Sequence, residues 1–236
     1  MRGCLVTLVF LLAIGVAATW FVLPPLIGTA TQGALAATGF VADSTTVTVS
    51  ADPPPELLTL KADSIRIQAT NLTYRGLSAT SADLTLHDVA FAERTFETVA
   101  GTLKGVRYQP DSGPELVAPL VRLTGPVNRI QATVTMPAAD AETLAIAAVE
   151  SGTGITPRSV VLSGKDRIQV DVNGLVVAAR LAIGDDGALT LEPPTGNPMG
   201  SIALVTPGPD APFRVESFSV VDGGLVIVAT LLADLG

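Results

Sequence analysis

Apolar and polar residues alternate along much of the chain after residue 44, which is typical of strands that bury one face. The alternation is clearest in residues 63–72, 83–89 and 127–136. In these segments, apolar side chains of one phase are expected to share the buried face of a sheet. They are Ile65, Ile67, Ala69, Leu84, Leu86, Ile130, Ala132, Val134 and Met136.

Shorter apolar or β-branched runs, separated by glycine, proline and Asn-Gly turns, predict the remaining strands. Asn173-Gly174 is the strongest two-residue hairpin signal in the chain. The further predicted strands are residues 45–49, 99–108, 116–123, 159–162, 168–172, 175–183, 188–191, 202–205, 213–221 and 225–232. Most of the chain is therefore predicted to form antiparallel strands.

Residues 138–151 break the alternation and predict a helix. Pro137 suits its first turn, because proline lacks the N–H that a helix start leaves unpaired. The helix is apolar over most of its circumference, mainly through small side chains. The residues on its apolar face include Leu144, Ala148 and Val149. We expect a β-dominated α+β fold in which a long sheet is arranged around this one helix.

The N-terminal segment Cys4–Leu23 contains no charged residue. As a helix it spans about 30 Å, enough to cross a bilayer, and Arg2 before it favours an N-in orientation. A cleaved signal peptide is the alternative, with small residues at 16–18 or 28–30 for a peptidase. Either way the rest of the chain is exported, membrane-bound through a single span or secreted after cleavage. The predicted organisation is 1–25 anchor or signal, 26–43 linker and 44–236 extracytoplasmic domain.

Charge and composition exclude several classes of function. The net charge of −8 opposes nucleic-acid binding, which relies on clustered lysine and arginine. It equally opposes attachment to anionic lipid mainly through charge. The single cysteine, Cys4, excludes an intrachain disulfide and a cysteine metal site.

The sequence contains no recognisable catalytic motif. His87 is the only histidine, and alternation places it away from the face that carries Leu84 and Leu86. Gly164-Lys165 lacks the spacing of a phosphate-binding loop, and no G-x-S-x-G motif is present. We therefore expect no enzyme activity, no metal site and no cofactor. An enzyme assembled from distant strands, with His87 as its acid–base group, is an alternative.

Several stretches together carry a family resemblance. Residues 212–227, PFRVESFSVVDGGLVI, contain a strand, a glycine turn and a final strand. Residues 62–72 and 82–89 form an earlier pair of alternating strands, and residues 186–193 contain Asp-Gly-Ala-Leu and Leu-Glu-Pro. In this order, and with the apolar N-terminus, residues 44–235 resemble the LmeA-like phospholipid-binding family of bacterial envelope proteins.

The resemblance implies a strongly twisted antiparallel sheet curled around the helix, like tubular lipid-binding modules. It also implies non-enzymatic binding or transfer of phospholipid or another membrane lipid at the outer face of the cytoplasmic membrane, in support of envelope lipid or lipoglycan assembly. Acyl chains would then lie in an apolar groove. The expected lining residues are Ile65, Ile67, Leu84, Leu86, Ile130, Val134, Leu144, Ala148 and Val149. The residues alone equally allow a structural or protein-interaction module with a filled core.

Overall fold

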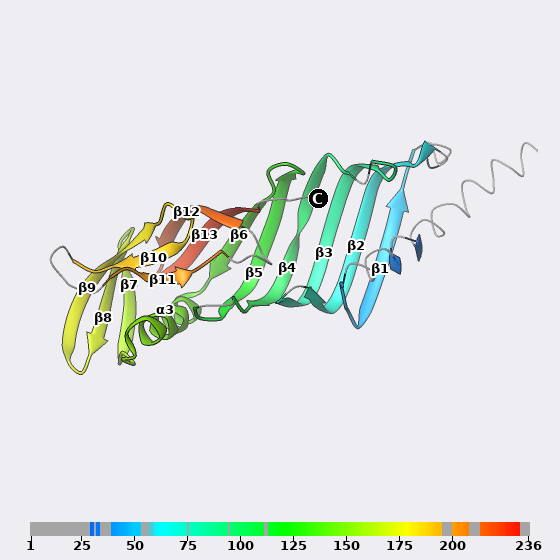
Figure 1. The fold of residues 1–236 in the computed structure, drawn as a ribbon. Helices are drawn as coiled ribbons and strands as arrows, with labels where there is room; N and C mark the ends of the chain where they lie inside the picture. The colour runs from blue at the N-terminus through cyan, green and yellow to red at the C-terminus, as the bar shows by residue number, and fades with distance from the viewer. Residues whose placement is uncertain are drawn as a thin grey trace, which may run out of the picture.

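The computed structural model of the protein describes residues 29–30, 32–33, 39–52, 57, 59–74, 76–93, 95–110, 113–194, 200–207 and 213–231. These residues form two antiparallel sheets, one of eight strands and one of five (Figure 1). The larger sheet contains β1 (Ser44–Ser50), β2 (Lys61–Tyr74), β3 (Leu77–Ala90), β4 (Thr98–Tyr108), β5 (Leu116–Pro126), β6 (Gln131–Met136), β12 (Phe213–Val221) and β13 (Gly224–Leu231). The smaller sheet contains β7 (Ser159–Ser163), β8 (Arg167–Val172), β9 (Leu175–Ile183), β10 (Leu189–Glu192) and β11 (Ile202–Val205).

The chain leaves the larger sheet once and returns to it. It runs as a meander from β1 to β6, crosses through the helix α3 (Ala138–Thr153) and builds the smaller sheet from β7 to β11. The hairpin β12–β13 then comes back, and β13 pairs with β6. Figure 1 shows the long strands at one end of the molecule, and α3 and the smaller sheet at the other.

The helix α3 lies where the two sheets meet, against β7, β11 and β13. It follows Pro137 and ends at Gly154, whose φ of 71° is left-handed and whose N–H donates to the Glu150 carbonyl over 2.8 Å. Its inward side chains are small except for two, so the helix approaches the sheets closely. The buried residues are Ala141, Leu144, Ala145, Ala148 and Val149.

The expected class, a β-dominated α+β fold with antiparallel strands, is confirmed. The strands form two sheets rather than one long sheet, because the crossover through α3 starts a second meander. The strand expected over 127–136 begins only at Gln131, since residues 127–129 turn at Pro126 and the N–H of Arg129 donates to the Pro126 carbonyl. Among the described residues, no helix combines the length and apolarity that a membrane span requires. The predicted span Cys4–Leu23 lies outside those residues.

A row of irregular positions crosses four strands of the larger sheet. Strand register places Asn71 opposite Thr80, Thr80 opposite Gly105, and Gly105 opposite Pro119. These four residues, which we call the crease, drop out of the regular pairing, although the register is the same on both sides. Asn71 and Gly105 have positive φ values of 47° and 57°, and proline at 119 has no N–H to donate.

The crease changes the spacing of buried residues along each strand. Inward side chains normally recur every second residue, but the buried residues that flank the crease are three apart. These pairs are Ala69 and Leu72, Ala79 and Ala82, Leu103 and Val106, and Ala118 and Val121. All eight belong to one hydrophobic cluster, so the inserted residues keep both parts of each strand facing the same side.

Gly105 provides a test of the crease. A Cβ at this position would lie 2.7 Å from Oγ1 of Thr80, whereas a Cβ at Gly164, which has a similar φ of 65°, meets nothing within 4 Å. Both substitutions to alanine strain the backbone, but only Gly105→Ala also crowds a neighbour. We expect Gly105→Ala to lower the free energy of unfolding by about 1–3 kcal/mol more than Gly164→Ala, measured by urea denaturation. Equal losses would show that the crease tolerates a side chain.

Candidate functional site

A cavity of about 300 Å³ lies on the inner face of the larger sheet. Its lining side chains are all aliphatic or aromatic, and they come from β2 to β6, β12, β13, the end of β11 and the segment before β1. They are Phe40, Leu72, Tyr74, Leu77, Ala82, Leu84, Leu103, Val106, Tyr108, Leu116, Val121, Leu123, Ala132, Val134, Val205, Phe213, Ile227, Ala229 and Leu231. The cavity therefore spans both sides of the crease.

Cross-strand register builds the floor of the cavity as rows of side chains. One row runs from β3 to β13, each member opposite the next: Ala82, Leu103, Val121, Val134 and Ile227. The row beside it contains Leu84, Gly101, Leu123, Ala132 and Ala229. The small residues of these rows leave space that an unbroken run of leucines would fill.

Gly101 allows Asp83 and Leu84 of β3 to approach β4 closely. A Cβ on Gly101 would collide with the backbone of Asp83 and lie 2.8 Å from Cδ2 of Leu84. Leu84 is half-buried and packs against both hydrophobic clusters, the main one and a second one around Ile65 at the β1 end of the sheet. The glycine thus places a leucine at the boundary between the cavity and the second cluster.

Three segments distant in the sequence cover the cavity. Phe40 comes from the segment before β1, Val205 from the end of β11 and Phe213 from the start of β12. The ring of Phe213 meets that of Tyr108 edge to face, with centroids 6.2 Å apart and an interplanar angle of 78°. Cavity closure therefore depends on the return of the chain from the smaller sheet.

Charged groups lie on the outer face of the sheet. The guanidinium of Arg66 lies 2.6 Å from the carboxylate of Asp83 and, mainly by hydrogen bonding, lowers the pKa of Asp83 below its ordinary value. The Thr230 hydroxyl donates to Glu216 over 2.6 Å and is the main cause of a lowered pKa there. Neither carboxylate lines the cavity, and among the described lining side chains none is ionisable near neutral pH. The described lining therefore offers apolar contacts to a ligand.

The structure brings together only part of the residues predicted to line a groove. Leu84 and Val134 line the cavity. Ile65 and Ile67 lie in the second cluster, with Leu86 packed against it, and Ile130 precedes β6. Whether these residues contact lipid stays a prediction.

The predicted helix residues lie apart from this cavity. Val149 lines a smaller apolar cavity of about 220 Å³ between α3 and the smaller sheet. Ala148 lines a pocket of about 600 Å³ at the end of α3, where Ser151 and Thr206 add hydroxyl groups. Leu144 packs in the main core and lines neither. The space beside the helix is thus separate from the space on the larger sheet.

Sequence reasoning missed the aromatic residues of the cavity. Tyr74, Tyr108, Phe40 and Phe213 lie on four different segments, and only strand register and the returning hairpin place them together. His87 is exposed on β3 and does not line the cavity. In the part of the chain that the structure describes, no cluster of three side chains is arranged to hold a metal ion.

The fold and the cavity define a β-rich protein that encloses space for an apolar ligand. The family model described as LmeA-like phospholipid-binding matches residues 25–230, and the chain belongs to this family. The resemblance found in the sequence is thereby confirmed. The search of curated proteins and the search of solved structures each gave no significant match.

Asp83 tests the separation of charge from the cavity. Because its pKa is lowered in the folded protein, its ion pair stabilises the fold above the pKa of the unfolded chain, and this stabilisation is lost as pH falls through the folded pKa. Asp83→Asn should therefore lower the urea midpoint near neutral pH, with a deficit that vanishes in strong acid. Binding of an apolar dye should not change. Asp88→Asn, on the same strand, is the matched control, and loss of dye binding in Asp83→Asn alone would contradict the separation.

Proposed function

We propose that the protein binds a phospholipid without transforming it, with acyl-chain methylenes in the cavity on the larger sheet. The observation that carries this proposal is the cavity of about 300 Å³ with an entirely aliphatic and aromatic lining. Membership of a phospholipid-binding family supports the choice of ligand. Acyl chains fit such a lining because they have no polar group to desolvate.

The cavity is expected to enclose only part of a phospholipid. Each methylene buried from water contributes about 0.8 kcal/mol, so a few methylenes already give useful affinity. The cavity volume lies at the lower end of ligand pockets, which run from roughly 300 to 1,000 Å³. Part of one chain therefore occupies the cavity, and the headgroup lies outside. We further propose that the sheets curl around the helix α3. A second acyl chain would then run in the smaller cavity beside Val149, with Ala148 nearby.

The predicted N-terminal anchor supports a location of the domain at the outer face of the cytoplasmic membrane. Phe40 lines the cavity, and it lies in the predicted linker 26–43, directly after the predicted membrane anchor or signal 1–25. An anchored domain 44–236 would thus hold its cavity near the outer face of the cytoplasmic membrane. There it would hold or transfer phospholipid in support of envelope lipid or lipoglycan assembly.

Filling the cavity tests this function. Ala132 is 7% exposed and lines the cavity, whereas Ala100 lies exposed on the outer face of β4. In Ala132→Phe the ring displaces about two methylenes of the ligand, which weakens binding more than tenfold at about 0.8 kcal/mol each. Native mass spectrometry of the full-length protein, released from detergent after incubation with phospholipid vesicles, measures the bound fraction. Ala100→Phe should bind as the unmodified protein does.

The controls separate lost binding from lost folding. Circular dichroism shows whether Ala132→Phe is folded, and Ala82→Leu is a smaller filling substitution in the same cavity. A folded variant that keeps its lipid would place the lipid elsewhere. An unmodified protein that carries no lipid and takes none up would instead support the structural or protein-interaction module.

A further inference from the structure

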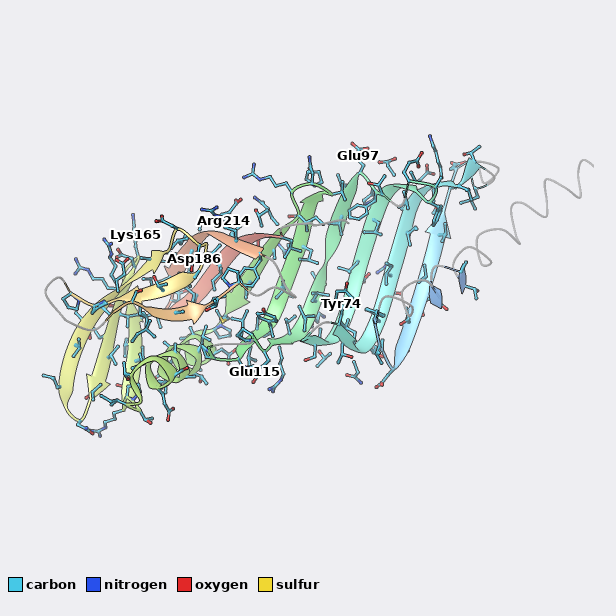
Figure 2. All side chains as sticks on the ribbon, viewed as in Figure 1. Tyr74, Glu97, Glu115, Lys165, Asp186 and Arg214 are labelled. Atoms are coloured by element: carbon cyan, nitrogen blue, oxygen red, sulfur yellow. The ribbon has the colours of Figure 1, made fainter. Side chains whose placement is uncertain are left out.

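The two ends of the smaller sheet differ in charge. Figure 2 shows Lys165 at the upper end of this sheet, in the turn between β7 and β8. Other charged side chains gather at this end, where Arg167 begins β8 and Arg180, opposite it, forms an ion pair with Glu192 over 3.0 Å. The turn between β8 and β9, Asn173-Gly174, lies at the opposite end of β8.

The end of the smaller sheet at this second turn exposes apolar side chains. Among the described large apolar residues, Leu175 has the largest exposed fraction, 68%, and its neighbour Val176 is 59% exposed. Ile155, which follows the end of α3, is 48% exposed and lines the same cavity as Leu175. We call these three residues the tip. Large apolar side chains that gather at one exposed place mark an interaction surface, whereas isolated ones are ordinary.

The tip lies at the open end of an apolar cavity. The cavity of about 220 Å³ between α3 and the smaller sheet is lined by Val149, Val170 and Leu191, each at most 7% exposed. Leu175 and Ile155 line the same cavity but are largely exposed. The lining therefore runs from the buried core to the surface at the tip. An acyl chain that enters here passes from one apolar contact to the next and leaves few methylenes in water.

Charged groups lie beside the tip and limit how deeply it can enter an apolar medium. Asp171 is opposite Val176, and its carboxylate accepts a hydrogen bond of 2.8 Å from the Gly174 N–H. Arg158 is exposed, and its backbone N–H donates to the Asp171 carbonyl. A zwitterionic phospholipid surface offers a phosphate to the guanidinium and an ammonium group to the carboxylate. These charges therefore suit the headgroup level, with Leu175 at the boundary of the acyl chains.

From this arrangement we infer that the tip docks on a phospholipid bilayer, with Leu175 and Ile155 at the acyl-chain boundary and the cavity open to the membrane. A bilayer fits better than a protein because the tip continues into a cavity that suits an acyl chain. The described lining of this cavity is apolar apart from the Thr153 hydroxyl, which donates to the Val149 carbonyl.

This inference rests on the proposed function, in which a second acyl chain runs in the cavity beside α3, and it adds the surface through which lipid enters. Docking lets the chain move between bilayer and cavity without crossing water. The contact is apolar, and the net charge of −8 opposes attachment to anionic lipid through charge. Docking should therefore occur on phosphatidylcholine vesicles and persist at high salt, which screens exposed charges.

Spin labelling of the full-length protein tests the docking. A Cys4→Ser background carries one new cysteine, Leu175→Cys, labelled with a nitroxide. The protein is held in nanodiscs, and protein-free phosphatidylcholine vesicles are added in excess so that the tip can reach a bilayer however the domain lies. The label at position 175 should be more accessible to oxygen, which concentrates in the bilayer, than to a water-soluble nickel complex. Val161→Cys, on β7 and 53% exposed, is the matched control and should show the reverse.

The outcomes separate the docking from the proposed function. A label at position 175 that stays in water, in a protein that nonetheless takes up phospholipid, would overturn the docking and leave the proposed function intact. Protection from both oxygen and the nickel complex would also overturn the docking, because it indicates contact with protein. An unmodified protein that takes up no phospholipid would refute the proposed function, and the docking with it.

Lipid uptake gives an independent measurement. Leu175→Asp places a carboxylate at the tip and should slow uptake of a fluorescent phosphatidylcholine from donor vesicles about tenfold, the factor by which burial of one leucine side chain shifts an equilibrium. Val161→Asp should take up lipid at the unmodified rate, and circular dichroism shows whether both variants are folded. When loaded from detergent instead, Leu175→Asp should reach the same bound fraction as the unmodified protein. Equal uptake rates for the two folded variants would overturn the docking.

Discussion

The structure depends on keeping one face of the larger sheet apolar across the crease. A strand exposes alternate side chains to opposite faces, so a one-residue slip in the pairing of two strands would move buried side chains to the outer face. Asn71, Thr80, Gly105 and Pro119 lie at the same level in four neighbouring strands, so the register is the same on both sides of them. The buried side chains on both sides of the crease belong to one cluster. The cavity lies over this line.

Most strands and the helix α3 could be predicted from the sequence, because alternation and helical spacing are local patterns. The grouping into two sheets could not, since it depends on the return of β12–β13 to β6. The crease could not be predicted from the sequence either, because it also depends on how the strands pair. Asn71 and Gly105 look like ordinary strand residues until strand register shows that they lie in one row.

The candidate site was only partly predictable for the same physical reason. Leu84 and Val134 were found because alternation assigns them to the buried face. Tyr74, Tyr108 and Phe213 gather at the cavity through register and chain return. The ion pair of Arg66 and Asp83 lies on the outer face of the sheet, away from the cavity. An acidic exterior and an apolar interior together favour a ligand that is recognised through its hydrocarbon part.

The central claim is that an acyl chain occupies the cavity on the larger sheet. The most direct measurement is nuclear magnetic resonance of the full-length protein in detergent, with labelled methyl groups and a phospholipid carrying ¹³C-labelled acyl chains. The account predicts intermolecular nuclear Overhauser effects from the acyl methylenes to the methyl groups of Leu84, Leu103 and Val134. Effects confined to methyl groups outside this cavity, or no effects at all from a bound lipid, would contradict it.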